Sequence, residues 1–134
     1  MAVVDASVIL SAILSGDPHH EASSAWLSTL VSSGRHFSTP AILLTEVAAP
    51  LSRAYNQPEL AGKVVQSLTT APYAKLVPVS LPLASKAAAI AAEYQIRGCD
   101  AVYVALAHSL GEELITLDKQ QSERAKSIDE TRQP

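Results

Sequence analysis

Cysteine, aromatic residues and charge are all scarce in this sequence. Its 134 residues include one cysteine, Cys99, so no disulfide can form within the chain. The longest stretch without a charged residue is 22–34, whereas a bilayer-spanning helix needs about 20 apolar residues. The N-terminus also lacks the positive segment of a signal peptide. These absences exclude a disulfide scaffold and a membrane span, and we expect a protein of the reducing cytoplasm.

Small aliphatic residues dominate what is present. Hydrophobic residues make up 48% of the chain, with 22 alanines and 16 leucines, which excludes a disordered protein and predicts one helix-rich domain over residues 1–134. The formal net charge is −3, from 13 acids and 10 bases. An acidic protein is unsuited to coating nucleic acid by bulk electrostatics. A nuclease remains possible, because the metal site of a nuclease itself concentrates carboxylates.

The hydrophobic pattern alternates between short strands and longer helices. Apolar residues at helical spacing predict six helices, at 6–14, 19–33, 41–55, 58–70, 82–95 and 100–110. One further short helix is expected in the polar segment 119–134. Short β-branched or apolar runs predict strands at 2–4, 36–39, 76–79 and 113–117, with a weak final strand at 127–129. Pro78 places the third strand at an edge or a bulge. We therefore predict a helix-dominated α/β fold, a three-layer α/β/α sandwich around a short parallel sheet.

Four acids stand out because of where they fall. Asp5 and Asp118 directly follow apolar strands, Asp100 heads an apolar helix, and Glu46 lies inside another. Each aspartate alone also fits a helix N-cap, and Ser7 is placed to cap the first helix. Glu46 lies inside a predicted helix and so cannot be its N-cap. Its place on an apolar segment needs another explanation, because ionised carboxylates are rarely buried without a partner. In a parallel sheet, however, the carboxyl ends of the strands meet at one edge, and there the acids would converge.

Converging carboxylates need a counter-charge. Two of them about 4 Å apart repel by on the order of 4 kcal/mol at an effective dielectric of about 20. Lys119 is the single basic residue that adjoins one of the acids in a way that suggests neutralisation. Oxygen-only ligands suit a hard dication, so the pattern predicts a site for Mg²⁺ or Mn²⁺ held by Asp5, Glu46, Asp100 and Asp118.

These residues resemble the four motifs of the PIN domain family, in the order and spacing of its VapC-like branch. The matching segments are Val3-Val4-Asp5-Ala6-Ser7, Thr45-Glu46-Val47, Gly98 to Ala107 and Thr116-Leu117-Asp118-Lys119. The resemblance implies a magnesium-dependent ribonuclease with a five-stranded parallel sheet between helices, and it makes the four acids catalytic. It also implies a type II toxin that forms a homodimer and binds a small antitoxin protein. Ser7 and Thr116 match hydroxyl positions beside the first and last acids.

An RNA substrate would need positive contacts on this acidic protein. Arg53 follows Glu46 by seven residues, nominally on the same helical face, and Arg97 and Lys119 flank two of the acids. We predict that these three residues contact phosphates, with Ser7 and Thr116 as further candidates for substrate contact. Each cation also fits an ordinary solvated surface residue. Pro50, four residues after Glu46, removes a helical hydrogen bond, and the resulting kink either aims Glu46 inward or displaces it.

Three other functions compete with a toxin ribonuclease. Phosphotransfer proteins also bind magnesium in an acidic pocket. The dehalogenase-type phosphatase pattern, however, requires an aspartate at position 7, where this chain has Ser7. A receiver domain requires a phosphorylated aspartate near mid-chain. The one acid within residues 50–80 is Glu59, which disfavours a receiver domain. The others are a PIN-like binding module without catalysis and a PIN nuclease of RNA maturation or turnover.

Overall fold

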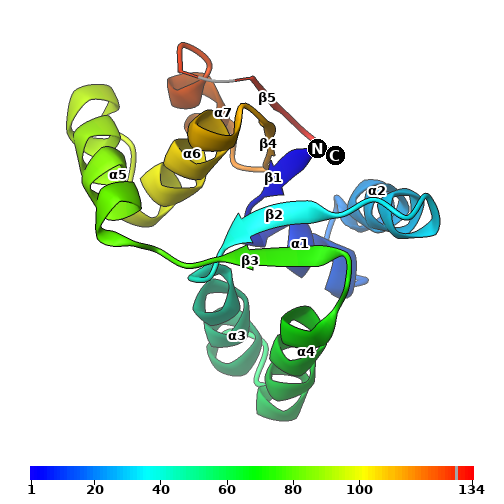
Figure 1. Cartoon of the computed structure of the whole chain (residues 1–134). Coiled ribbons are helices and arrows are strands. Elements are labelled where there is room, and N and C mark those ends of the chain that lie inside the picture. The colour runs from blue at the N-terminus through cyan, green and yellow to red at the C-terminus, as the bar shows by residue number, and fades with distance from the viewer. Residues whose placement is uncertain (129) are drawn as a thin grey trace.

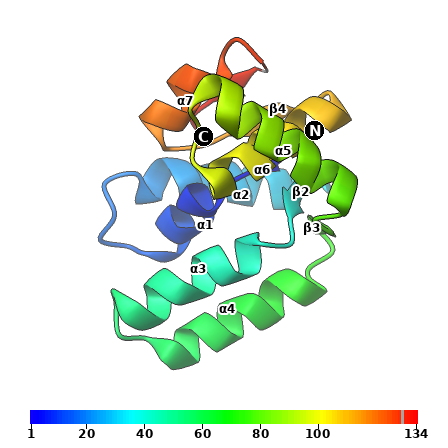
Figure 2. The same cartoon turned by 90° about the vertical axis from the view of Figure 1, so that its left-hand side faces the viewer.

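The computed structural model describes residues 1–128 and 130–134. Its five strands are β1 (Ala2–Val4), β2 (Phe37–Pro40), β3 (Ala74–Val77), β4 (Glu113–Ile115) and β5 (Thr131–Arg132). Its seven helices are α1 (Ala6–Ile13), α2 (His20–Ser32), α3 (Leu43–Arg53), α4 (Pro58–Thr70), α5 (Leu81–Tyr94), α6 (Gly98–Leu110) and α7 (Lys119–Ala125). Figures 1 and 2 show these elements from two directions.

All the strand pairings of the sheet are parallel, in the order β3-β2-β1-β4-β5. Helix α6 packs against β1, β2 and β4, and α5 packs on α6. Helix α1 contacts α2 and α3, and α3 pairs with α4, which reaches β3 (Figure 1). The predicted three-layer, helix-dominated α/β fold with a short parallel sheet is confirmed.

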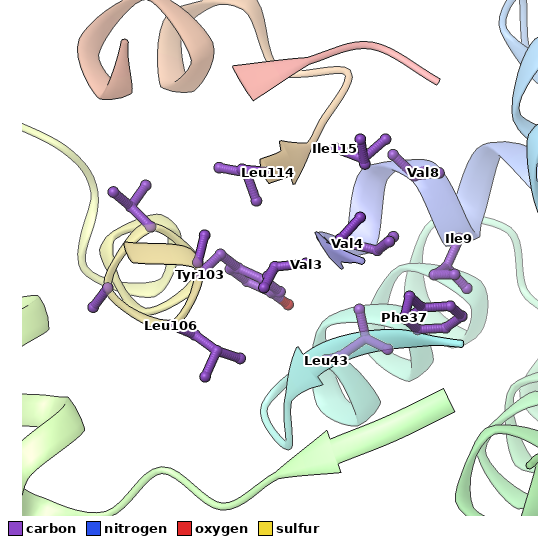
Figure 3. Packing of buried hydrophobic residues seen from close by; sticks show 14 of the residues in the cluster. Val3, Val4, Val8, Ile9, Phe37, Leu43, Tyr103, Leu106, Leu114 and Ile115 are labelled. Atoms are coloured by element: carbon purple, nitrogen blue, oxygen red, sulfur yellow. The ribbon is translucent and has the colours of Figure 1, made fainter. Parts of the chain in front are cut away.

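The central strand is buried on both faces. Val3 and Val4 are each 0% exposed, and Figure 3 shows Val3 toward α6 while Val4 lies toward Val8 on α1. Neighbouring residues of a strand point to opposite faces, so a strand covered by helices on both sides must be apolar throughout. This explains why three residues of β1 are enough to place Asp5 at a fixed point on the sheet edge.

Two proline-containing segments differ from expectation in instructive ways. Pro40, which lies just beyond the strand predicted at 36–39, ends β2 and pairs with Val77 of β3, whereas β2 pairs with β1 through Phe37 and Ser38. A residue without an N–H is tolerated where one ladder has already ended. β3 lies at the sheet edge, as Pro78 predicted, but it ends at Val77, before the proline.

The C-terminal strand begins later in the chain than predicted. The predicted strand at 127–129 is wrong for residues 127 and 128, which lie in a turn, and residue 129 is outside the described residues. Instead β5 is two residues long and pairs with β4, through Leu114 with Thr131 and Ile115 with Arg132. Within the described part of the chain, no helix combines the length and apolar character needed to cross a membrane.

Candidate active site

Three helix N-termini meet at the carboxyl edge of the sheet, and each carries an aspartate. Asp5 caps α1 and accepts the Ser7 N–H, and Asp118 caps α7 and accepts N–H groups of Gln120 and Gln121. Asp100 lies in the first turn of α6, whose N-cap is Arg97. Helix N-termini favour negative charge, so the fold offers these carboxylates favourable backbone dipoles. The cap interpretation is therefore right for Asp5 and Asp118, and their role as metal ligands stays a prediction.

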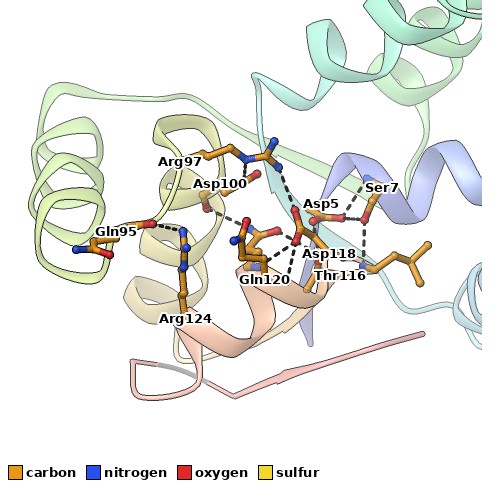
Figure 4. A network of polar contacts seen from close by, with 11 residues as sticks. Asp5, Ser7, Gln95, Arg97, Asp100, Thr116, Asp118, Gln120 and Arg124 are labelled. Atoms are coloured by element: carbon orange, nitrogen blue, oxygen red, sulfur yellow. Dashed lines mark hydrogen bonds and ion pairs between the residues drawn. The ribbon is translucent and has the colours of Figure 1, made fainter.

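Asp5 lies at the centre of a buried hydrogen-bond network. It is 5% exposed, and its backbone N–H binds the Ile115 carbonyl of β4. The Ser7 hydroxyl donates to Asp5 Oδ1 at 2.5 Å, and the Thr116 hydroxyl donates to Asp5 Oδ2 (Figure 4). Ser7 Oγ in turn accepts the Leu117 N–H at 3.1 Å, which ties α1 to the segment after β4. The first acid is thus held by the start of α1, by β4 and by the segment that follows β4.

Burial makes the ionised form of Asp5 costly. It raises the pKa of Asp5 from 3.8 to about 6, although hydrogen bonds from Ser7 and Thr116 act in the opposite direction. The negative charge of Asp100 raises this pKa further, which places the two carboxylates within electrostatic reach. Asp5 is therefore a carboxylate whose charge is stabilised incompletely by its protein surroundings.

Arg97 bridges two of the other acids. Its Nε lies 2.8 Å from Asp100 Oδ2 and its Nη2 lies 3.0 Å from Asp118 Oδ2 (Figure 4). The hydrogen bond and charge of Asp100, with the charges of Asp118 and Glu46, raise the pKa of Arg97. The expectation that no cation except Lys119 neutralises the acids was wrong, because residues 97 and 118 meet only in the folded chain. The Arg97 side chain is 73% exposed, so water can solvate it if it leaves.

Glu46 is directed toward the same edge by a tyrosine. The Tyr103 hydroxyl of α6 donates to Glu46 Oε1 at 2.6 Å, and Tyr103 is 1% exposed. Burial and the hydrogen bond to Glu46 raise the pKa of the Tyr103 phenol well above its usual range. Helix α3 continues past Pro50 to Arg53, so the missing hydrogen bond does not end the helix. The charge of Glu46 also contributes to raising the pKa of Arg97, and an effect of Pro50 on the direction of Glu46 stays a prediction.

The remaining predicted residues divide into two groups. Ser7 and Thr116 bind Asp5 with their hydroxyls, so their role in this structure is to orient the first acid, and a contact with substrate stays a prediction. Ser7 does not cap α1, because Asp5 occupies the N-cap. Arg53 and Lys119 are exposed, Arg53 at the end of α3 beside a shallow hollow and Lys119 next to Asp118. Phosphate contact by these two cations is likewise still a prediction.

Gln121 completes the network, although sequence reasoning did not select it. It is 3% exposed, its Nε2 donates to the Asp100 carbonyl at 3.2 Å, and its Oε1 lies 3.1 Å from Thr116 Oγ1. The single hydroxyl proton of Thr116 can serve only one acceptor at a time, and Asp5 is the closer one. The one available signal is the position of Gln121, three residues after Asp118, the N-cap of α7. A side chain at that position of a helix can reach back toward the cap.

The chemistry of these donors fits a hard dication. Four carboxylates lie at this edge, and Asp5 carries a charge that the protein stabilises only in part. The Cys99 thiol, whose pKa is raised by burial and by the charge of Glu46, lies beside Glu46. Across residues 1–128 and 130–134, however, no three acidic, histidine or cysteine side chains are arranged to hold one ion. The Arg97 guanidinium lies between two of the acids instead. Binding of a dication therefore requires Arg97 to release Asp100 and Asp118.

Substituting Thr116 with valine tests how much the network stabilises the Asp5 charge. Loss of a hydrogen bond to a buried carboxylate is expected to lower the free energy of unfolding by about 1.5–3 kcal/mol at pH 7. The loss should be smaller at pH 4.5, where Asp5, with a pKa of about 6, is protonated in the folded state. Urea denaturation at both pH values measures this difference.

Thr39 supplies the matched control for that substitution. It is 0% exposed, and its hydroxyl donates to the Val4 carbonyl, which does not titrate. Thr39→Val should therefore destabilise the protein equally at pH 4.5 and pH 7. If Thr116→Val behaves in the same pH-independent way, the Thr116 hydroxyl does not stabilise a charged Asp5.

Comparison with known proteins gives a consistent result. The model of the PIN domain family matches residues 2–127. Among solved structures, the Mycobacterium tuberculosis toxin VapC20, described as cleaving the sarcin-ricin loop, superposes with a TM-score of 0.78 at 18% identity, covering 92% of this chain and 94% of that one. FitAcB from Neisseria gonorrhoeae gives 0.73 at 18% identity, covering 98% and 96%. VapBC2 from Rickettsia felis, bound to a promoter DNA fragment, gives 0.73 at 14% identity, covering 99% and 98%. No curated protein matches the sequence.

Proposed function

Because this chain belongs to the PIN domain family, whose model spans residues 2–127, we propose that it is a metal-dependent ribonuclease that hydrolyses RNA phosphodiester bonds. The observation that carries the proposal is the buried Asp5 carboxylate, with a pKa near 6, at an edge where Glu46, Asp100 and Asp118 also gather. The strand order β3-β2-β1-β4-β5 also differs from the 2-1-3-4-5 order of receiver domains. A receiver domain therefore has no support.

Each residue of the site has a proposed part in this reaction. Asp5, Glu46, Asp100 and Asp118 would hold Mg²⁺ or Mn²⁺, and Ser7 and Thr116 keep the Asp5 carboxylate oriented. The chemistry that the ion supplies when bound is activation of water for attack on phosphorus and neutralisation of charge on the phosphate. Arg97, once free of Asp100 and Asp118, contacts a phosphate of the RNA together with Arg53 and Lys119.

We further propose that the protein is the toxin of a type II toxin–antitoxin pair in the cytoplasm. Support comes from its structural likeness to the toxin VapC20 and to a toxin–antitoxin complex from Klebsiella pneumoniae, which has a TM-score of 0.63 at 19% identity. Its partners would be a small antitoxin and a second copy of the chain, for which Leu81 on α5, 80% exposed, offers apolar surface. An antitoxin-sized reading frame beside the gene would separate this role from RNA maturation or turnover.

Asp118→Asn tests the ribonuclease proposal with little risk to folding, because asparagine caps helices as well as aspartate does. We expect wild-type protein to cleave structured RNA with Mg²⁺ or Mn²⁺ and to lose cleavage in a chelator. The variant should lose more than the roughly 10- to 100-fold that removing a residue supporting a ligand costs. Glu93→Gln, on the exposed side of α5, makes the same change in charge and should cleave normally. Chelator-resistant cleavage, or a fully active Asp118→Asn variant, contradicts the proposal.

One observation favours a binding module without catalysis as the second candidate. Arg97 already bridges Asp100 and Asp118, as a permanent structural ion pair would. Under this alternative, dications neither bind the acidic edge nor displace Arg97, and RNA remains intact in the cleavage assay described above.

A further inference from the structure

Tyr103 and Glu46 join two helices that carry different acids of the site. Glu46 lies on α3, and Tyr103 lies on α6, three residues after Asp100. The donor and acceptor oxygens are 2.6 Å apart, although the two residues are 57 positions apart in the chain. This hydrogen bond is a direct side-chain link between the helix of the second acid and the helix of the third.

The tyrosine end of this link is fixed by packing. Its ring is 1% exposed and extends from α6 beside Val3 of the central strand (Figure 3). A tyrosine ring has two rotatable side-chain bonds, and close packing leaves it one position. The hydroxyl is the only polar atom of this side chain, and facing a carboxylate it must act as donor. The direction of the hydroxyl is therefore set by the core.

The glutamate end depends on the tyrosine for its strong hydrogen bond. Glu46 has three rotatable side-chain bonds, is only half-buried and forms no salt bridge among the described residues. Besides Tyr103, the Cys99 thiol of α6 is a weak hydrogen-bond donor to Glu46. Pro50 removes the N–H that would bind the Glu46 carbonyl, so the backbone here lacks one of its usual constraints. Its contact with Tyr103 is the hydrogen bond that directs the carboxylate toward α6, where Asp100 and Arg97 lie.

We propose that Tyr103 is a positioning residue, whose hydroxyl holds the Glu46 carboxylate toward the acidic edge so that Glu46 can serve as a ligand. The proposal rests on the proposed function, because it assigns Tyr103 a part in that site. Tyr103 would not touch RNA or the ion, and it would act entirely through Glu46. Residues that orient a metal ligand typically change metal affinity by about 10- to 100-fold when removed.

The test compares four variants, with Mn²⁺ affinity measured without RNA and cleavage measured separately. Tyr103→Phe removes only the hydroxyl, and Glu46→Ala removes its acceptor. The third variant combines both changes, and Tyr73→Phe is the control. Tyr73 precedes β3 at the opposite end of the strands, where its ring packs against Phe37 with centroids 6.1 Å apart. Circular dichroism and thermal unfolding verify that each variant folds.

Three results are expected if Tyr103 positions Glu46. Tyr103→Phe weakens Mn²⁺ binding about tenfold or more and lowers kcat, with the KM for RNA unchanged, whereas Tyr73→Phe matches wild type. High Mn²⁺ concentration restores much of the lost kcat. Adding Tyr103→Phe to Glu46→Ala causes no further loss of Mn²⁺ affinity, because the two residues act as one unit.

Two outcomes would overturn the positioning role while leaving the ribonuclease proposal intact. One is wild-type Mn²⁺ affinity in Tyr103→Phe, and the other is a loss in the double variant equal to the sum of the two single losses. A wild-type chain that neither binds Mn²⁺ nor cleaves RNA is a different result, which rejects the proposed function and the positioning role with it.

Discussion

Asp5→Asn is expected to stabilise the metal-free protein at neutral pH while abolishing RNA cleavage. The side chain is 5% exposed, and burial raises its pKa from 3.8 to about 6. A shift of about 2 pKa units corresponds to roughly 3 kcal/mol, which is the cost of keeping Asp5 ionised in the folded state. Asparagine carries no charge and avoids this cost. It also binds a dication poorly, so stability and activity should change in opposite directions.

The pH dependence of protein stability shows in which direction Asp5 changes the free energy of unfolding. The folded state holds the Asp5 proton up to about pH 6, whereas the unfolded chain releases it near pH 3.8. Between these values the folded state binds more protons, so the contribution of Asp5 to stability falls as pH rises. Above pH 6 the contribution is constant and unfavourable. The stability gained by Asp5→Asn should therefore be small at pH 4, grow through pH 4–6 and level off at up to about 3 kcal/mol.

Urea denaturation of both proteins from pH 4 to pH 8 in a chelator measures this difference. Glu93→Gln controls for the loss of one negative charge, because Glu93 is exposed on α5. Added Mn²⁺ should raise the Tm of the wild type and leave Asp5→Asn nearly unchanged, since the ion stabilises only a protein that binds it. A stability difference that is the same at every pH would mean that Asp5 carries no burial cost.

The fold and the places of Asp5 and Asp118 could be predicted because they depend on local patterns. Strands of three to five apolar residues that are each followed by a helix indicate a parallel sheet. An acid that directly follows such a strand lies at the carboxyl edge of that sheet. Asp5 and Asp118 are therefore placed by β1 and β4 alone. The two-residue strand β5 could not be located, because its polar residues carry no alternating pattern.

The contacts between the acids could not be predicted, because they join residues far apart in the chain. Arg97 reaches Asp118 across 21 residues, and Tyr103 reaches Glu46 across 57. Composition suggested an acidic cluster that lacks a cation, whereas the folded chain places one exposed guanidinium between two of its members. The sequence-based view of the electrostatics was therefore right for Asp5, which forms no salt bridge within the described part of the chain, and wrong for Asp100 and Asp118.

Arg97→Gln is expected to raise Mn²⁺ affinity about tenfold while weakening RNA binding. A dication that uses Asp100 and Asp118 must break both Arg97 contacts, and each exposed ion pair is worth about 0.2–1 kcal/mol. Removing the guanidinium also removes its repulsion of the ion. Isothermal titration with Mn²⁺ measures the affinity. The KM for RNA should rise, because the same guanidinium is the proposed phosphate contact.

The position of Arg97 makes this substitution informative. It is the N-cap of α6, where the helix dipole disfavours a positive side chain, so the cation is kept there by Asp100 and Asp118 and not by the helix. Arg132→Gln breaks a comparable exposed pair with Glu113, at the opposite end of β4, and should leave Mn²⁺ affinity unchanged. If Arg97→Gln instead lowers stability without any gain in Mn²⁺ affinity, Arg97 is a structural bridge, and the acidic edge is built to bind its own arginine and not a catalytic ion.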